Sequence, residues 1–166
     1  LDSDEFDDIV VTTDDSIFIL TSDGQGGIAS QLVITSESET EPFTSLSSIE
    51  IGDFDNDGDN DIVVTDATLN RLIPIFNTPE ELQQFTIGDS SPTGPLPIDL
   101  AVMDINDDEI QDVIVVCQGY SADLPGSLDF FTFQDGSLTG GFNQAGTISL
   151  SGQPSGIDPG DVNNDK

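Results

Sequence analysis

The chain is 166 residues long and carries 33 acidic side chains against two basic ones, with no histidine and a formal net charge of −31. A surface this acidic repels nucleic acid and anionic lipid, so neither is expected as a direct partner. The sequence also contains no apolar stretch long enough to span a membrane as a helix.

Short runs of β-branched and aromatic residues, separated by turn residues, predict an all-β chain. No window of about 11 residues keeps a convincing helical period. In chain order, the expected strands cover residues 9–11, 17–20, 31–34, 48–52, 62–64, 72–76, 85–87, 100–103, 113–117, 128–133 and 147–150. The runs at 9–11, 62–64 and 113–117 are almost wholly apolar, which predicts burial on both faces.

An acidic loop joins the expected strands at 48–52 and 62–64. Its acids alternate along the chain, with Gly58 in the middle: Asp53, Asp55, Asp57, Asp59 and Asp61. Carboxylates at this density are the hard oxygen ligands that Ca²⁺ prefers. Two carboxylates about 4 Å apart repel by roughly 1 kcal/mol in water, and by about 4 kcal/mol at an effective dielectric of about 20. The loop therefore needs a cation, or it must open out.

The acidic loop recurs along the chain. The second copy has the pattern Asp104, Asn106, Asp108, Ile110 and Asp112. Partial copies lie at the two ends, with the patterns Asp2, Asp4, Phe6 and Asp8, and Asp161, Asn163 and Asp165. Recurrence at roughly 50 residues is typical of a propeller or another repeat array.

Four expected strands accompany each acidic loop, as a propeller blade requires. We predict about three four-stranded antiparallel blades, belonging to a propeller that is larger or is completed by oligomerisation. The approximate blades are 1–43, 44–96 and 97–150, with a further blade starting at 151–166. An EF-hand is not expected, because its bidentate glutamate at loop position 12 is replaced by Val64 and Val115, each inside an expected strand.

An Asp-x-(Asp/Asn)-x-Asp-(Gly)-x-x-Asp loop followed directly by a strand resembles the calcium loop of FG-GAP/VCBS repeats, which form the blades of integrin-α-like β-propellers. The resemblance implies Ca²⁺ held by side chains at loop positions 1, 3, 5 and 9 and by the carbonyl at position 7. In this sequence the implied side chains are those of Asp53, Asp55, Asp57 and Asp61, and of Asp104, Asn106, Asp108 and Asp112. The implied carbonyls are those of Asp59 and Ile110.

The two loops differ at two of these positions. Gly58 adopts a left-handed backbone conformation freely, whereas Glu109 does so at a cost. Asn106 also removes one negative charge, and ligand charge helps to set calcium affinity. We therefore expect the 53–61 loop to bind calcium more tightly than the 104–112 loop.

The ends of the chain have the appearance of two parts of one blade. Residues 154–161 are predicted to be a first strand, and residues 9–34 to be strands two to four. In a longer chain these parts belong to different neighbouring blades. If the chain is complete, the first strand of one copy is expected to dock against strands two to four of another copy, giving a ring or a fibre.

Catalysis is not expected, because the chain has no histidine for a serine or cysteine nucleophile to use. Cys117 lies in an apolar run and is predicted to be a buried thiol, and Tyr120 a surface tyrosine. We expect a secreted or cell-surface prokaryotic module that binds another protein or a surface glycan. The alternatives are a structural subunit of an extracellular filament or surface layer and, less favoured, part of a glycan-active enzyme.

Overall fold

The structure is a computed structural model, which describes residues 1, 6–36, 42–78, 85–133 and 140–160. These residues form an all-β fold with no helix, as the sequence predicts. The strands are β1 (Ile9–Thr12), β2 (Ser16–Ser22), β3 (Ile28–Thr35), β4 (Leu46–Gly52), β5 (Asp61–Asp66), β6 (Arg71–Asn77), β7 (Phe85–Ile87), β8 (Ser91–Pro92), β9 (Pro97–Met103), β10 (Asp112–Cys117), β11 (Ser127–Phe133) and β12 (Phe142–Ser149).

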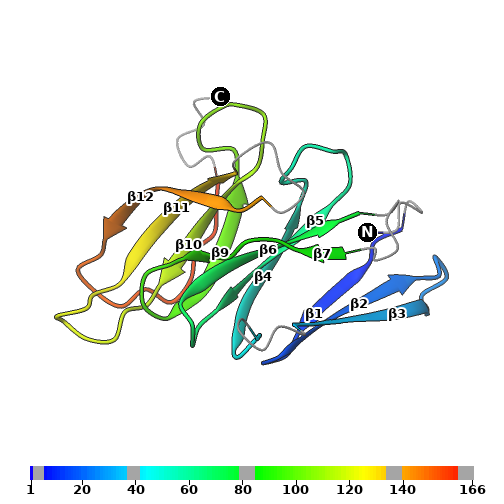
Figure 1. Cartoon of the computed structure of the whole chain (residues 1–166), viewed down its shortest axis with the longest axis horizontal. Coiled ribbons are helices and arrows are strands. Elements are labelled where there is room, and N and C mark those ends of the chain that lie inside the picture. The colour runs from blue at the N-terminus through cyan, green and yellow to red at the C-terminus, as the bar shows by residue number, and fades with distance from the viewer. Residues whose placement is uncertain (2–5, 37–41, 79–84, 134–139, 161–166) are drawn as a thin grey trace.

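The strands form three antiparallel sheets that follow one another along the chain. The orders are β1-β2-β3, β4-β5-β6-β7 with β8 beside β6, and β12-β11-β10-β9. Figure 1 shows the three sheets arranged side by side along the long axis, with β1–β3 at one end and β9–β12 at the other. This is the arrangement of successive propeller blades. We call the sheets the first, second and third blade.

Two apolar cores lie between the blades. In the first core, β2 of the first blade packs against β4–β7 of the second. Its buried members are Ile17, Ile19, Phe43, Leu46, Ile62, Val64, Ile73, Ile75 and Phe85. The second core joins the second and third blades through Phe54, Val63, Leu72, Leu100, Val113, Val115, Cys117, Phe131 and Phe142. Alternate residues of β5 enter the two cores, so the second blade is buried on both faces, as its continuous apolar sequence predicts.

The strand predictions are confirmed to within a few residues for β1 to β7 and β9 to β12. The short strand β8 was not predicted, because Ser91 and Pro92 lie in a cluster of turn residues. The strand predicted at 154–161 is wrong for its described part, since residues 154–160 form no strand. Pro154 and Pro159 have no N–H to donate to a ladder, and the N–H of Ile157 instead bonds the Asp99 carboxylate at 3.0 Å.

The burial predicted for the first apolar strand is also wrong. Ile9 and Val11 in β1 remain 51% and 44% exposed, whereas every residue of β5 and β10 is buried. The cause lies outside the strand itself, because no described residues form a blade over that side of β1. The sequence pattern indicates which strands can be buried on both faces, but it does not indicate whether another sheet covers each face.

The remaining single residues behave as predicted. The Cys117 thiol is fully buried, and burial, with the nearby Asp129 carboxylate, raises its pKa to about 12. A thiol with this pKa is inert at neutral pH. Tyr120 is exposed and its hydroxyl reaches Asn70 Oδ1 at 3.4 Å. Within the described part of the chain, no helix has the length and apolarity needed to cross a membrane.

Candidate metal centre

The 53–61 loop joins β4 to β5 and is folded by its own aspartates. Asp53 accepts backbone N–H bonds from Asp57 and Gly58 at 3.2 and 3.1 Å. Asp55 accepts a second bond from the N–H of Asp57 at 3.2 Å, and Asp57 accepts one from Asp59 at 2.9 Å. Short acidic side chains favour such local bonds to the backbone, which is why they build tight loops.

Two residues of this loop have a positive φ. Asn56 has a φ of 59° and Gly58 a φ of 97°. Asparagine tolerates the left-handed region better than most residues, and glycine adopts it without steric cost. The tight curvature turns the side chains of the loop towards a common centre.

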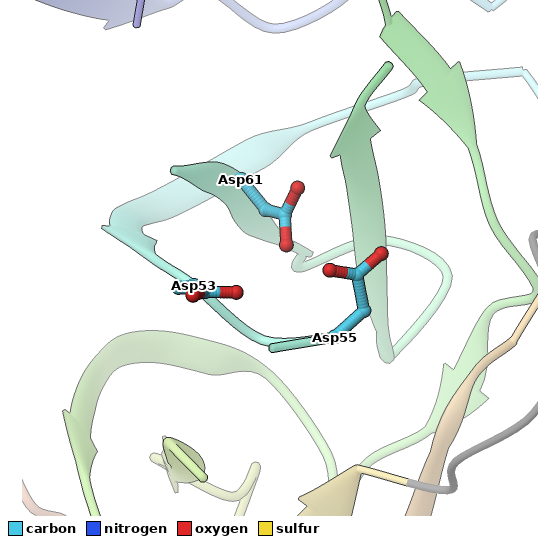
Figure 2. Close-up of side chains that lie close together, drawn as sticks. All are labelled: Asp53, Asp55 and Asp61. Carbon is cyan, nitrogen blue, oxygen red and sulfur yellow. The ribbon is translucent and has the colours of Figure 1, made fainter. Parts of the chain in front are cut away.

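Three carboxylates meet inside the loop, from Asp53, Asp55 and Asp61 (Figure 2). One oxygen from each lies within 4.8 Å of the others. Ca²⁺ binds oxygen at about 2.3–2.6 Å, so oxygens on opposite sides of one ion are about 4.6–5.2 Å apart. The three side chains are therefore close enough to share a single calcium ion, and their all-oxygen character fits it.

Asp61 is the buried member of the three. Its two oxygens accept the N–H groups of Asn77 at 2.8 Å and of Phe54 at 3.1 Å. Burial raises the pKa of Asp61 to about 7, and repulsion from Asp55 and Asp57 adds to the increase, although the two hydrogen bonds oppose it. The pKa of Asp55 is raised as well, first by burial and then by Asp57. A cation at the centre would reverse this penalty, because opposite charge favours the ionised carboxylates.

Asn77, at the end of β6, supports the site from behind and was not predicted. Its side-chain amide donates to the carbonyls of Asn60 and Leu1 at 3.2 and 3.0 Å. Its Oδ1 atom is buried without a hydrogen-bond partner among the described residues. No loop pattern could identify Asn77, because it lies 16 residues after Asp61 and reaches the site only when β6 pairs with β5.

The 104–112 loop, between β9 and β10, repeats the same hydrogen bonds. Asp104 accepts from Asp108 and Glu109 at 3.2 and 2.9 Å, and Asn106 accepts from Asp108 at 3.0 Å. The N–H of Ile110 bonds Asp108 at 2.9 Å. Asp112 accepts from Ile105 at 3.0 Å, as Asp61 does from Phe54. The two loops therefore share the same pattern of side-chain to backbone hydrogen bonds.

The second loop nevertheless gathers fewer carboxylates than the first. Asn106 stands where Asp55 stands in the first loop, and the 53–61 loop is the one place in the described chain where three acidic groups come within 4.8 Å. Glu109 takes the place of Gly58 and holds a φ of 70°, which is strained for a residue with a side chain. Burial raises the pKa of Asp112, whereas several N–H donors, led by Glu109, outweigh desolvation and lower that of Asp104.

The other predicted site residues have different surroundings. Asp57, Asp59, Asp108 and Ile110 lie in the two loops, but their side chains do not join the three clustered carboxylates. Asp8 bonds the amino group of Leu1 at 2.7 Å and the N–H of Ser22 at 3.1 Å. The exposed ring of Phe6 lies against Gly24. The predicted ligands Asp2, Asp4, Asp161, Asn163 and Asp165 lie outside the described residues.

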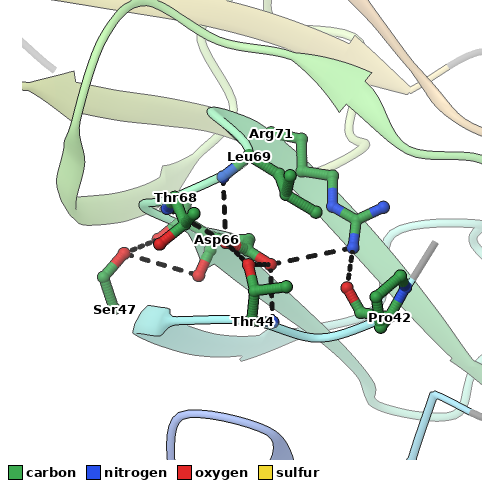
Figure 3. A network of polar contacts seen from close by, with 8 residues as sticks. Pro42, Thr44, Ser47, Asp66, Thr68, Leu69 and Arg71 are labelled. Carbon is green, nitrogen blue, oxygen red and sulfur yellow. Dashed lines mark hydrogen bonds and ion pairs between the residues drawn. The ribbon is translucent and has the colours of Figure 1, made fainter.

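A second buried aspartate, Asp66, is not a metal ligand. Figure 3 shows it held by Thr44, Thr68 and Leu69, with the Arg71 guanidinium 3.7 Å away. Burial alone would raise the pKa of Asp66, but the bonds from Thr44, Leu69 and Thr68 outweigh it and lower the pKa. Arg71 also donates to the carbonyl of Pro42 at 2.6 Å. This buried network ties the segment before β4 to β6.

The fold and the loops together define a protein built of propeller-like blades that carry acidic loops between their strands. Residues 1–64 match the model of the FG-GAP-like repeat family, and the matched segment contains the whole 53–61 loop. The chain therefore carries an FG-GAP-like repeat, as its motifs predict. A search of curated proteins gave no significant match.

Proposed function

We propose that the chain is an extracellular calcium-binding propeller module in which Ca²⁺ at the 53–61 loop fastens β4 to β5. The observation that carries this proposal is the meeting of Asp53, Asp55 and Asp61 within 4.8 Å. The FG-GAP-like repeat supports it, because such repeats often bind calcium and are typically extracellular. The role of the ion is structural, since it would neutralise a buried carboxylate at the start of a fully buried strand.

The 104–112 loop is proposed as a second, weaker calcium site of the same design. Its shared hydrogen bonds support the assignment, and Asn106 and the strained Glu109 account for the lower affinity. The 53–61 loop is expected to fill first as calcium is added.

The module is proposed to act by binding, in adhesion to another protein or a surface glycan. An absence of histidine from the whole sequence removes the usual general base, and the clustered carboxylates already have a role as metal ligands. Immobilised protein should capture a defined protein or glycan from an extracellular panel, and the capture should weaken when calcium is chelated. Turnover of a glycan substrate would instead identify an enzyme.

Thermal unfolding with calcium, magnesium or a chelator tests the calcium site itself. At calcium concentrations about 100 times the dissociation constant, the ion should stabilise the fold by about 2.7 kcal/mol. Magnesium should stabilise it less, because its shorter oxygen distances of about 2.0–2.1 Å suit this cluster poorly.

Two variants make the thermal experiment specific. Asp61→Asn should remove most of the stabilisation by calcium, whereas Asp123→Asn, which removes the same charge from an exposed loop, should leave it unchanged. An equal calcium response in wild type and Asp61→Asn would refute the site.

A further inference from the structure

Phe54 is bound on every side by the clustered carboxylates of Figure 2. It stands between Asp53 and Asp55 in the sequence, and its N–H bonds Asp61 at 3.1 Å. The three residues proposed as calcium ligands therefore flank or bond Phe54, although its own side chain offers no ligand atom. The position of this residue depends directly on the geometry of the loop.

The side chain of Phe54 packs between the second and third blades. It is completely buried and belongs to the second core. Its ring meets the ring of Phe142, at the start of β12 in the third blade, with 5.6 Å between the centroids and 78° between the planes. This edge-to-face geometry is a favoured one for two aromatic rings. One residue of the metal loop thus makes a specific contact with the neighbouring blade.

The ring pair is part of an aromatic cluster that holds the two blades together. Phe142 packs edge to face on Phe133 of the same blade, with 5.7 Å between the centroids. Phe133 in turn packs on Phe76 of the second blade, also at 5.7 Å. Because a closely packed core transmits displacements, a movement of Phe54 would be felt across the contact between the blades.

A second contact joins the two acidic loops directly. Gln111, near the end of the 104–112 loop, places its Oε1 atom against Gly52, where β4 leads into the 53–61 loop. A Cβ atom at Gly52 would collide with this oxygen, and it would lie 3.2 Å from Cζ of Phe54. The end of one loop therefore packs on the start of the other, beside the Phe54 ring.

The preceding repeat has a similar arrangement. Leu1 stands one residue before Asp2, as Phe54 stands one residue before Asp55. The side chain of Leu1 packs against the first core, between the first and second blades. Its carbonyl accepts a hydrogen bond at 3.0 Å from the side chain of Asn77, in the second blade. The same loop position therefore contacts the next blade in two successive blades.

We propose that Phe54 is a positioning residue through which calcium at the 53–61 loop controls the packing of the third blade on the second. Without the ion, repulsion among the carboxylates favours an open loop, which draws the Phe54 ring away from Phe142. With the ion bound, the residues on either side of Phe54 are held together and its ring is seated in the second core. The coupling rests on the calcium site that is proposed above.

Such a coupling must act in both directions. If calcium strengthens the contact between the blades, then a weaker contact must weaken calcium binding by the same factor. Phe142, a third-blade residue without a ligand atom, should therefore influence the calcium affinity of a loop in the second blade. If Phe54 only filled the core, the calcium affinity would not depend on Phe142.

Calcium calorimetry on the whole chain tests this dependence. Every protein carries Asp108→Asn, which removes an acidic ligand from the 104–112 loop, so that the tighter dissociation constant belongs to the 53–61 loop. Phe54→Leu and Phe142→Leu remove the ring pair and leave the carboxylates of the 53–61 loop in place. Each should raise this constant by at least about fivefold, the lower end of the usual coupling between sites.

Phe43→Leu is the matched control. Phe43 is also a buried ring, but it belongs to the first core. Its neighbour Thr44 bonds Asp66, which places it at the end of β5 opposite the 53–61 loop. The substitution should therefore leave the calcium dissociation constant unchanged.

Nuclear magnetic resonance gives a readout that needs no core substitution. Calcium added to the protein should shift the ring resonances of Phe142 together with the amide resonances of residues 53–61. The ring resonances of Phe43 should not shift. A shift confined to the loop would show that the ion leaves the contact between the blades unaltered, and would overturn the coupling.

The possible failures can be told apart. No calcium binding by the parent protein would refute the calcium site and, with it, the coupling. Calcium binding with the same dissociation constant in the parent, Phe54→Leu and Phe142→Leu would overturn the coupling and leave the site standing. Equal losses of affinity in these variants and in Phe43→Leu would assign the effect to general destabilisation and also overturn the coupling. Circular dichroism verifies that each variant is folded.

Discussion

The two ends of strand β5 carry buried aspartates in opposite electrostatic situations. Asp61 begins the strand and Asp66 ends it, and both are fully buried. Burial would raise the pKa of Asp66, but hydrogen bonds from Thr44 and from the turn after β5 outweigh it and lower the pKa; the Arg71 guanidinium lies 3.7 Å away. Burial, with a smaller contribution from the neighbouring carboxylates, raises the pKa of Asp61 to about 7 despite its two backbone N–H bonds.

This contrast shows how the chain handles buried negative charge. One aspartate is compensated by a cation that belongs to the protein, Arg71. The other is compensated only if a cation comes from solution. Both side chains are inaccessible to solvent, but burial dominates at Asp61, whereas hydrogen bonds outweigh it at Asp66. If calcium binds at Asp61 as proposed, the stability of β5 should depend on the calcium concentration.

The largest expected effect comes from removing the internal cation. Arg71→Met should destabilise the fold by about 3–5 kcal/mol, because it leaves Asp66 buried without its partner charge. Urea unfolding followed by circular dichroism measures the loss. The double variant Arg71→Met/Asp66→Asn should recover part of it, since the uncompensated charge is then absent. A single-variant loss below about 1 kcal/mol would show that the hydrogen bonds alone hold Asp66.

Exchanging one ligand between the two loops should exchange their calcium affinities. Asp55→Asn gives the 53–61 loop the third-position residue of the 104–112 loop, and Asn106→Asp does the reverse. We expect about a tenfold loss at the first loop and a gain at the second, equivalent to about 1.4 kcal/mol each. Calcium calorimetry on both variants measures the shift. Unchanged affinities in both would remove ligand charge as the cause of the difference.

Substitutions at Gly58 and at the equivalent Glu109 should change the folding stability by a smaller amount. Gly58→Ala should destabilise the metal-free protein by about 1–2 kcal/mol, because alanine is strained at a positive φ. A steric clash does not contribute, because an added Cβ would meet nothing within 4 Å. Glu109→Gly should stabilise by up to about 1 kcal/mol, after the greater freedom of glycine in the unfolded chain is subtracted. Chemical denaturation compares the two. Gly146→Ala, also in open space and without a positive φ, is the control.

The smallest expected effect is on the pH dependence of folding stability, which should differ between Asp66 and Asp61. A lowered pKa at Asp66 contributes stability above its ordinary value of 3.8, which is lost as the pH falls through the folded-state pKa. A raised pKa at Asp61 acts in the opposite direction in metal-free protein, whose stability should decrease as the pH rises from 3.8 to about 7.

Paired variants isolate each of these contributions. The stability difference between wild type and Asp66→Asn should shrink as the pH falls below about 4. The corresponding difference for Asp61→Asn, measured in a chelator, should change between pH 4 and about 7. Parallel pH profiles for both pairs would show that the two buried aspartates do not differ.

The local features of the molecule could be predicted from its sequence. The acidic loops are folded by bonds between residues at most seven apart, such as Phe54 and Asp61, so their pattern contains most of the information needed. The strands follow from continuous apolar runs bounded by turns. The strained backbone of Glu109 could also be anticipated, because Gly58 occupies the equivalent position in the 53–61 loop.

The non-local features could not be predicted in this way. Asn77 reaches Asp61, and Arg71 reaches Asp66 and Pro42, only after β5 and β6 have paired and the segment before β4 has closed over them. The exposure of Ile9 depends on whether another blade covers it, and residues 154–160 form no strand because their prolines lack an N–H and the Ile157 N–H bonds the distant Asp99. Each of these outcomes is set by a neighbour distant in sequence, which local pattern does not specify.

A crystal structure grown with calcium would show whether the 53–61 loop binds the ion. We expect one cation in this loop, at about 2.3–2.6 Å from oxygens of Asp53, Asp55 and Asp61, with an anomalous signal that identifies calcium. The Asp66 network should be unchanged, with Arg71 in place beside it. A loop without a cation in saturating calcium, with the three carboxylates turned apart, would refute the proposed calcium site.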